Sequence, residues 1–296
     1  MGRHLVRRLA SLGHDVVAVS RRPWPDAPQR VNLRIAEPRA REEFELLLKD
    51  VGTVIHLAAS STPGSTAGLP LLEMESNLRP TLALLEALQS ASPASLLYVS
   101  SAGTLYQPRA GIPSLEDSPL LPRSYHGAGK AAAEAFIHAW TSQCGASATV
   151  LRPSNVYGPG QSHKKGFGII PAALAKLRDA EELIIWGDGN IVRDFLFIDD
   201  FVALCLAVLN AGMRQGMQVV NAARGEGTRL NDLLATMEGV TGRRLRRRYE
   251  PARSVDCARA DIDPGLASRL FGWKARIGLE EGLQRTWHWM LGREVP

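Results

Sequence analysis

The chain has 296 residues, of which 45% are hydrophobic and 22% are charged, and this is the ordinary composition of a globular protein. The length is enough for one large domain or for a large and a small one, and no apolar run reaches the roughly 18 residues that a membrane span needs. The net charge is +5, and several arginines fall within residues 243–248 with no aromatic residue among them. A solvated strand edge is therefore favoured over a nucleic-acid site, and we expect neither a nucleic-acid partner nor a membrane.

The three cysteines, Cys144, Cys205 and Cys257, lie far apart in the sequence. Their spacing matches neither a metal site nor a disulfide framework, which favours a reducing compartment. Residues 1–8 lack the continuous apolar core of a secretion signal. We therefore expect a cytoplasmic protein without a metal site.

Helices and short apolar strands alternate along the first half of the chain. Residues 5–12 follow a helical period, Gly13 stands where a helix often ends, and a buried strand follows at residues 15–20. The pattern continues with predicted helices at residues 42–49, 77–90 and 131–141, and with predicted strands at residues 51–59, 95–101 and 148–152. This alternation predicts an α/β protein in which helices cover both faces of a parallel sheet.

Small and polar residues gather at the ends of these predicted strands. Parallel sheets bind ligands beyond the carboxyl ends of their strands, so these residues are the first candidates for a binding site. They are Ser20, residues 58–60, residues 100–104 and residues 153–155. After residue 155 the pattern is less regular and richer in glycine and proline, as expected of a part that shapes a substrate site.

The segment Ser124–Lys130 follows Pro122 and runs into an alanine-rich stretch, which predicts the start of a helix. Lys130 follows His126 by four residues and Tyr125 by five, so its ammonium would lie about one turn from a titratable ring. A cation at that distance favours the deprotonated form of a phenol and lowers its pKa toward the range of an acid–base catalyst. A solvated helix face is the alternative interpretation of this spacing.

Three longer motifs occur along the chain. Residues 54–59 read VIHLAA, residues 151–161 read LRPSNVYGPGQ, and residues 186–200 contain WGDG, RDF and IDD. In these motifs the chain resembles the extended short-chain dehydrogenase/reductases, specifically the NAD-dependent epimerase/dehydratase family that acts on nucleotide sugars. The resemblance covers nearly the whole chain and extends to Asn77, Pro251–Arg253, Asp256, Ala260–Asp261 and Phe271–Trp273.

The resemblance implies a fold and an activity. The fold is a Rossmann-type doubly wound parallel sheet with a small C-terminal substrate-binding part. Residues 1–155 would form the dinucleotide-binding domain, and residues 156–296 a mixed region that shapes the substrate site and partly returns to the first domain. The activity is the NAD(P)-dependent oxidation and reduction of a sugar carbon in a nucleotide diphosphate sugar, such as the 4-epimerisation of a UDP-sugar. A homodimer is the usual assembly of the resembled family.

The resemblance also implies roles for single residues. Lys130 would bind the nicotinamide ribose and tune the catalytic pKa, and Asn155 would contact the substrate. Arg193 and Arg253 would bind diphosphate, because a guanidinium donates two parallel charge-assisted hydrogen bonds. The alternatives are surface salt bridges for the two arginines and a strand-end turn bond for Asn155. The cofactor would lie against Leu57, Ala58, Ala59 and Pro153.

The chain departs from the family pattern at its start. Family members begin with a strand and a glycine-rich turn, G-x-x-G-x-x-G, which lets a pyrophosphate approach a helix N-terminus. Here Gly2 occupies the position of the last glycine of this motif, and the strand and the other two glycines are absent from the given sequence. We therefore expect an N-terminally truncated chain whose sheet lacks its first strand and which binds a dinucleotide weakly.

The catalytic positions also depart from the pattern. Family members use a tyrosine four residues before the lysine, together with a serine or threonine. Alignment on Lys130 puts His126 at the tyrosine position, and Tyr125 lies about 100° further round the helix. Ala102 takes the usual serine or threonine position, so Thr104 is expected to supply that hydroxyl. A histidine carries a proton near neutral pH, and either His126 or Tyr125 would do so here.

The cofactor and the activity therefore stay open. NAD-preferring members carry an acid at the end of the second strand, where this chain has Ser20, Arg21 and Arg22. Two guanidinium groups in place of that acid favour a 2′-phosphate, so NADP is as well supported as NAD. The alternatives to an epimerase or dehydratase are an inactive homologue that binds a nucleotide sugar or a dinucleotide, and an NADPH-dependent carbonyl reductase.

Overall fold

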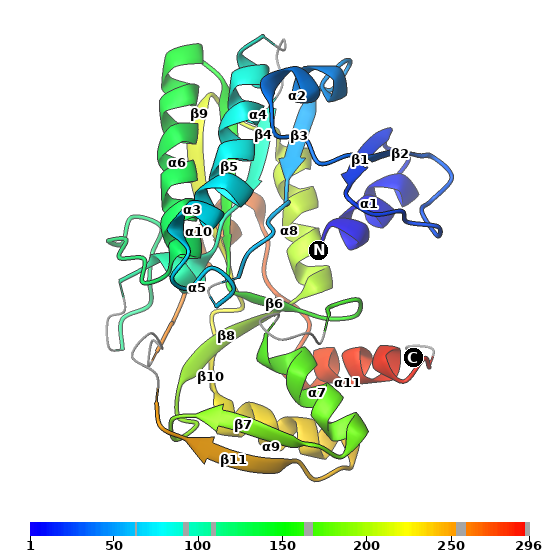
Figure 1. Ribbon diagram of the computed structural model, residues 1–296, viewed down its shortest axis with the longest axis vertical. Helices are drawn as coiled ribbons and strands as arrows, with labels where there is room; N and C mark the ends of the chain where they lie inside the picture. Colours follow the sequence, from blue (N-terminus) through cyan, green and yellow to red (C-terminus); the bar gives the residue numbers. More distant parts are fainter. Residues whose placement is uncertain (63, 91–94, 108–110, 163–167, 253–258, 294–296) are drawn as a thin grey trace.

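A computed structural model describes residues 1–62, 64–90, 95–107, 111–162, 168–252 and 259–293. Its main sheet has four parallel strands (Figure 1). In spatial order they are β3 (Thr53–His56), β4 (Ser95–Val99), β5 (Ser147–Pro153) and β9 (Gly216–Ala222). The last strand comes from beyond residue 155, so the chain returns to the sheet after leaving it. The boundary expected at residue 155 stays a prediction.

A second parallel pair lies beside the main sheet. It consists of β1 (Val16–Ser20) and β2 (Val31–Ile35). Within the described residues, β1 pairs only with β2 and β3 pairs only with β4, so no strand joins the two sheets. Val17 and Val19 of β1 are 42% and 44% exposed, which is unusual for an apolar strand at this place in an α/β sheet.

Helices cover both faces of the main sheet, and β4 shows this directly. Leu96 and Tyr98 pack into one core with the helices α2 (Arg41–Leu47), α4 (Arg79–Ser90) and α6 (Tyr125–Cys144). Leu97 and Val99 point the other way, as alternate residues of a strand do, and pack into a second core. That core includes α1 (Gly2–Ser11), α8 (Ile198–Ala211) and α10 (Gly265–Phe271). The doubly wound α/β arrangement predicted from the alternating pattern is confirmed.

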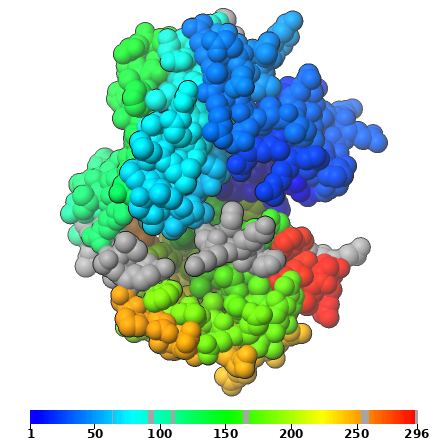
Figure 2. All heavy atoms as spheres, viewed as in Figure 1, coloured from blue at the N-terminus to red at the C-terminus, as the bar shows by residue number. Residues whose placement is uncertain are grey.

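The remaining strands and helices form a lower part (Figure 1). Its strand β8 (Val192–Phe197) pairs in parallel with β6 (Asn155–Tyr157) and antiparallel with β10 (Gly227–Arg229). A separate parallel pair consists of β7 (Glu182–Trp186) and β11 (Arg246–Glu250). The helices of this part are α7 (Ile169–Asp179), α9 (Leu230–Thr241) and α11 (Leu279–Met290). Figure 2 shows the two parts as an upper and a lower lobe.

Short helical segments stand at the carboxyl ends of the main strands. They are α3 (Pro70–Glu73), the π-helix η1 (Met74–Leu78) and α5 (Ala102–Leu105). The long helix α6 begins next to them, because the Ser124 hydroxyl accepts a hydrogen bond from the Gly127 N–H at 3.1 Å. A Cβ at Gly127 would lie 2.6 Å from the Thr104 carbonyl oxygen, so α6 and α5 approach this closely only with glycine there.

A buried ion pair ties α6 to the sheet. The Arg152 guanidinium of β5 donates to both carboxylate oxygens of Glu134, and the Nη2–Oε2 distance is 2.6 Å. Arg152 also donates to the Tyr106 hydroxyl at 2.9 Å, which in turn donates to Asn221 of β9 at 2.6 Å. The network therefore holds the carboxyl ends of β5 and β9 together. No helix in the described part of the chain is both long and apolar enough to cross a membrane.

Candidate active site

Lys130 lies buried at the end of β4. Its Nζ donates a hydrogen bond to the Val99 carbonyl oxygen at 2.7 Å and to the Tyr98 hydroxyl at 3.3 Å, and it lies 4.6 Å from the centre of the Tyr98 ring. Burial lowers the pKa of Lys130 from 10.5 to about 8, although the carboxylates of Glu73 and Glu134 act in the opposite direction. The side chain is thus fixed at the ligand-binding edge of the sheet.

His126 and Tyr125 lie on different sides of α6. His126 is 8% exposed and stands one turn before Lys130 on the same face, whereas Tyr125 is 42% exposed. Burial lowers the pKa of His126, the Lys130 ammonium lowers it further, and the Glu73 carboxylate opposes both effects. Of the two candidate proton carriers, His126 is the one that shares a buried environment with Lys130.

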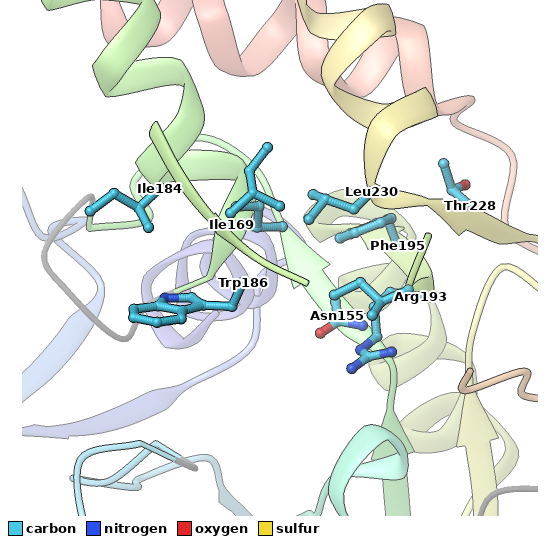
Figure 3. A pocket seen from close by; sticks show the side chains of 10 residues that line it. Asn155, Ile169, Ile184, Trp186, Arg193, Phe195, Thr228 and Leu230 are labelled. Carbon is cyan, nitrogen blue, oxygen red and sulfur yellow. The ribbon is translucent and has the colours of Figure 1, made fainter. Parts of the chain in front are cut away.

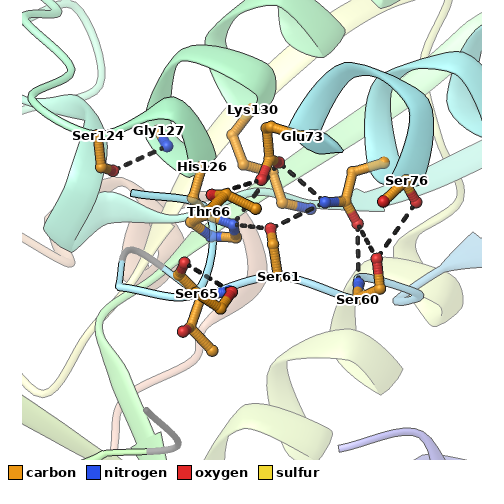
Figure 4. Close-up of polar contacts among 12 residues, drawn as sticks. Ser60, Ser61, Ser65, Thr66, Glu73, Ser76, Ser124, His126, Gly127 and Lys130 are labelled. Atoms are coloured by element: carbon orange, nitrogen blue, oxygen red, sulfur yellow. Dashed lines mark hydrogen bonds and ion pairs between the residues drawn. The ribbon is translucent and has the colours of Figure 1, made fainter. Parts of the chain in front are cut away.

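Four residues form a cluster beside the His126 ring, and of these Ser61, Thr66 and Glu73 were not expected from the sequence (Figure 4). The Ser61 hydroxyl lies 2.8 Å from His126 Nδ1, and Glu73 Oε1 lies 3.9 Å from the same nitrogen. Asn77 Nδ2 donates to both Ser61 Oγ and Glu73 Oε1, at 2.8 and 2.9 Å. Thr66 donates to the other carboxylate oxygen of Glu73 at 3.1 Å. Asn77 was noticed only as a family residue, without a role in this cluster.

Thr104 is the hydroxyl residue of α5 that was expected to replace the usual serine or threonine. Its Oγ1 is buried and has no hydrogen-bond partner within the described residues. A buried hydroxyl without a partner costs free energy, so a ligand atom that bonds to it would be favoured. By contrast, the Ser100 hydroxyl donates to Glu134 and is already used.

The candidate cofactor residues line the carboxyl ends of several strands. Ser20 ends β1, and its hydroxyl donates to the Arg22 carbonyl oxygen at 2.9 Å. Arg21 lies 3.7 Å from Glu37, and both arginines are exposed. Gly2 opens α1, whose first turn has no side-chain cap. The remaining candidates are Leu57, Ala58 and Ala59, which follow β3, and Pro153, which ends β5 and is buried.

A pocket of about 230 Å³ opens in the lower part, between strands β6, β7, β8 and β10 (Figure 3). Asn155, Trp186 and Arg193 lie on one side of it, and Ile169 and Leu230 lie on the other. Asn155 Nδ2 donates to the Asp194 carbonyl oxygen at 2.8 Å, and Arg193 Nη1 donates to the Val192 carbonyl oxygen at 2.8 Å. The lining of the pocket thus includes the aromatic ring of Trp186, the amide of Asn155 and the guanidinium of Arg193. Trp186 was part of a sequence motif, but its place in the pocket was not foreseen.

Asp194 fixes the loop beside this pocket. Its buried carboxylate accepts hydrogen bonds from three successive backbone N–H groups, of Arg224, Gly225 and Glu226. Burial raises the pKa of Asp194, although these hydrogen bonds act against the rise. The RDF motif thus contributes two side chains, Arg193 and Phe195, to the pocket and one, Asp194, to its support. Arg253, the second candidate for the diphosphate, lies outside the described residues.

Comparison with known proteins gives a consistent result over most of the chain. The model of the family described as "NAD dependent epimerase/dehydratase family" matches residues 1–223. A putative UDP-glucose 4-epimerase of Methanocaldococcus jannaschii is 29% identical over 98% of this chain and 95% of its own length. A dTDP-4-dehydro-6-deoxy-D-allose reductase of Streptomyces bikiniensis is also 29% identical, over 98% of this chain and 92% of its own.

The fold gives the same result. The crystal structure of a UDP-glucose 4-epimerase from Thermotoga maritima, solved with UDP-glucose, superposes with a TM-score of 0.91 at 26% identity. The superposition covers 98% of this chain and 95% of the other. The expected Rossmann-type architecture is confirmed by this likeness.

Proposed function

This chain belongs to the NAD-dependent epimerase/dehydratase family, as its motifs predicted, and from that premise we propose that it changes the configuration of a sugar carbon in a UDP-sugar. The observation that carries the proposal is the pairing of the buried Lys130 and His126 at the sheet edge with the pocket of Trp186 and Arg193 below it. The first pair supplies proton chemistry and the second supplies groups that suit a nucleotide. A solved structure with the same architecture is a UDP-glucose 4-epimerase, and a relative by sequence is a putative one.

The residues at the sheet edge fit a nicotinamide dinucleotide. Beside them, the Thr104 hydroxyl has no partner among the described residues and is available to the substrate oxygen. At Gly2, no described atom outside its own helix turn lies within 4 Å of the place where a Cβ would stand, so the space beside this backbone is open to a ligand. The cofactor, when bound, supplies hydride acceptance and donation. Lys130 would hold its ribose, Leu57, Ala58, Ala59 and Pro153 would line its site, and Ser20, Arg21 and Arg22 would meet its adenosine end.

His126 is the proton carrier that the geometry favours. Its Nδ1 faces Ser61, which leaves Nε2 as the ring nitrogen for the hydroxyl of the substrate. While the sugar carbon is oxidised, the neutral His126 imidazole accepts the proton of the hydroxyl on that carbon. It returns the proton when the carbon is reduced again from the opposite face of the sugar. Thr104 would hold the same substrate oxygen. In this proposal two of the three usual catalytic positions are substituted, and Tyr125 takes no part because it is exposed and outside the buried cluster.

The pocket in the lower part would bind the nucleotide. An indole such as Trp186 stacks on a base, and base stacking on an aromatic ring is worth about 1–3 kcal/mol. The Arg193 guanidinium would bind the diphosphate, with Arg253 as its partner, and Asn155 would contact the sugar or the phosphate. This division assigns the dinucleotide to residues 1–155 and the nucleotide sugar mainly to residues 156–296.

A homodimer is part of the proposal. One face of α6 is exposed and apolar, with Phe136 at 49% exposure and Ala128, Ala135 and Ala139 at helical spacing beside it. Two such faces can pack closely because alanine lets helix backbones approach each other. We propose the cytoplasm as the compartment, because Cys144 and Cys205 are both free thiols.

The test is product analysis. The chain is incubated with UDP-glucose, UDP-galactose, UDP-glucuronate or UDP-N-acetylglucosamine and with NAD or NADP, and the sugar is followed by proton NMR. The dinucleotide is supplied at millimolar concentration. The proposal expects an epimer of at least one sugar to accumulate to equilibrium without net consumption of dinucleotide. If every sugar stays unchanged with both dinucleotides, the proposal fails.

A reductase is the second candidate, and the exposed Arg21 and Arg22 at the end of β1 favour it. Guanidinium groups at this place suit the 2′-phosphate of NADPH, and a relative of equal identity is a reductase of a dTDP-sugar. A reductase would consume free NADPH stoichiometrically with a keto sugar, whereas an epimerase would not. Absorbance at the reduced nicotinamide band separates the two. An inactive binder would do neither, and would bind ligands without any turnover.

A further inference from the structure

The buried carboxylate of Glu73 lies beside the ring of His126 (Figure 4). The hydrogen bonds of Glu73 indicate that this carboxylate is ionised. Glu73 is 3% exposed, and each of its oxygens accepts a hydrogen bond, one from Asn77 and one from Thr66. A carboxylate that accepts at both oxygens behaves as an ionised group, and burial without a positive partner would be costly. Lys130 and, when it holds a proton, His126 are the cations that the surroundings provide.

The orientation of the Asn77 amide fixes the rest of the cluster. The Ser60 backbone N–H donates to Asn77 Oδ1 at 2.8 Å, so Asn77 Nδ2 must be the end that donates to Ser61 and to Glu73. The Ser61 oxygen accepts this hydrogen bond and keeps a lone pair that can accept from the His126 Nδ1–H, and in that tautomer Nε2 is free to take a proton. Glu73 and Asn77 are four residues apart across the π-helix η1, a distortion found often at functional sites.

Helix α6 is shaped to receive this carboxylate. Gly129 sits between His126 and Lys130, and a Cβ there would lie 3.0 Å from Glu73 Oε1. A glycine inside a helix costs about 0.5–1 kcal/mol relative to alanine, so this one needs a packing reason. Space for the Glu73 carboxylate is that reason, and it is independent of the hydrogen bonds.

We propose that Glu73 is a positioning residue for catalysis: with Ser61 and Asn77 it holds the His126 imidazole, and its charge stabilises the imidazolium that forms when His126 takes the substrate proton. The inference rests on the proposed function and names the residue that lets a histidine do the work of the usual tyrosine. In the proton transfer the O–H bond of the substrate breaks and an N–H bond forms at Nε2. The positive charge so created is shared with a carboxylate 3.9 Å from Nδ1.

The charged groups that act on His126 come from two directions. Lys130, on the same helix, disfavours the imidazolium, and Glu73, on α3, favours it. The loop after β3 contributes the neutral Ser61 hydroxyl, and α5 approaches the helix start with the backbone carbonyl of Thr104. Removal of the Glu73 charge therefore leaves Lys130 unopposed and lowers the pKa of His126 further.

The experiment compares Glu73→Gln with Glu75→Gln. Glu75 lies in the adjacent turn and forms an exposed ion pair with Arg79, so its variant controls for the loss of one negative charge. The His126 ring is titrated by NMR, with His126→Asn to assign its signal, and kcat and KM for the active UDP-sugar are measured against pH. In Glu73→Gln we expect a lower titration midpoint, an acidic limb of the rate profile shifted to lower pH, and kcat reduced about tenfold or more with KM little changed. Glu75→Gln should behave as the unmodified chain.

Two results would overturn the proposal. One is an unchanged His126 midpoint in Glu73→Gln, and the other is a midpoint that falls while the rate profile stays where it was. If Glu73→Gln does not fold, Ser61→Ala replaces it, because it removes the hydrogen bond to Nδ1 and keeps the charge. That variant should lower kcat with KM unchanged, and an unaltered kcat contradicts the proposal. If no UDP-sugar is turned over at all, the proposed function fails and the catalytic role fails with it, while the NMR titration still decides whether Glu73 controls His126.

Discussion

The Lys130 ammonium donates to the carbonyl oxygen of Val99, the last residue of β4, at a distance of 2.7 Å. This bond ties a catalytic candidate on α6 to the end of a central strand, where parallel sheets bind their ligands. The same burial that fixes Lys130 makes its charge expensive, and its pKa falls to about 8 as a result. A measurable pH dependence of both stability and activity follows.

Lys130→Met should abolish most turnover and remove a specific part of the pH dependence of stability. The unfolded chain keeps this lysine protonated up to about pH 10.4, whereas the folded chain loses the proton near pH 8. The unfolded state thus binds more protons between these values, so the lysine's contribution to the free energy of unfolding rises with pH there, by at most roughly 3 kcal/mol. Urea unfolding at pH 7.5 and pH 10 should show this rise in the unmodified chain relative to Lys130→Met. If the free energy of unfolding depends on pH equally in both proteins, the lowered pKa of Lys130 is contradicted.

Trp186→Ala should weaken the binding of UDP about 5- to 100-fold, through the loss of base stacking. Trp289→Ala is the matched control, because both indoles are 41% exposed and Trp289 lies on α11, away from the pocket lining. Isothermal titration with UDP measures the effect. Equal affinities of the two variants for UDP would show that the nucleotide does not bind in this pocket.

Arg193→Gln should raise KM for the UDP-sugar about 10- to 100-fold, because a hydrogen bond from a charged group to phosphate is lost. The expected change in kcat is small, since Arg193 lies in the pocket of the lower part. Arg246→Gln, on the exposed edge strand β11, controls for net charge. A change in kcat alone would speak against a diphosphate contact.

Arg152→Met should lower the free energy of unfolding by about 3–5 kcal/mol, because it leaves the Glu134 carboxylate buried without its partner. The double variant Arg152→Met with Glu134→Leu should recover most of that loss, since it removes both charges together. Urea unfolding monitored by circular dichroism checks both. If the single variant loses less than about 1 kcal/mol, the network does not support the sheet as described.

Phe136→Glu should convert the proposed dimer to monomers by placing a charge in the apolar face of α6. Gln143→Glu, at the exposed end of the same helix, should leave the assembly unchanged. Sedimentation velocity measures the mass of each. A monomeric unmodified chain would rule out the dimer.

Periodicity predicted the strands β3, β4 and β5 and the helix α6, because local pattern determines them, but it did not predict the strands that line the pocket of the lower part. The spacing of His126 and Lys130 placed both on one helix face, and the structure puts both in the same buried layer. The strand β2 was missed, although its sequence from Val31 to Ile35 alternates apolar and polar residues in the way an edge strand does. That signal was present but short.

Glu73 could not have been found in the same way. It lies in a four-residue helix followed by a π-helix, so its side-chain direction does not follow from an α-helical period. Its partner His126 is more than 50 residues away and meets it only through the fold. The hint in the sequence was Gly129, because a glycine inside an alanine-rich helix lowers helix stability. The structure explains it, since the Glu73 carboxylate packs against this glycine.

The most direct test of the account follows the hydrogen on the sugar carbon. UDP-glucose carrying deuterium at C4 is incubated with the chain and NAD in ordinary water, and the epimer is examined by NMR and mass spectrometry. The account predicts that UDP-galactose forms with the deuterium still at C4, and that His126→Asn forms it at least about a hundredfold more slowly. Epimer that has exchanged its deuterium for solvent hydrogen, or formation at an equal rate in His126→Asn, would contradict it.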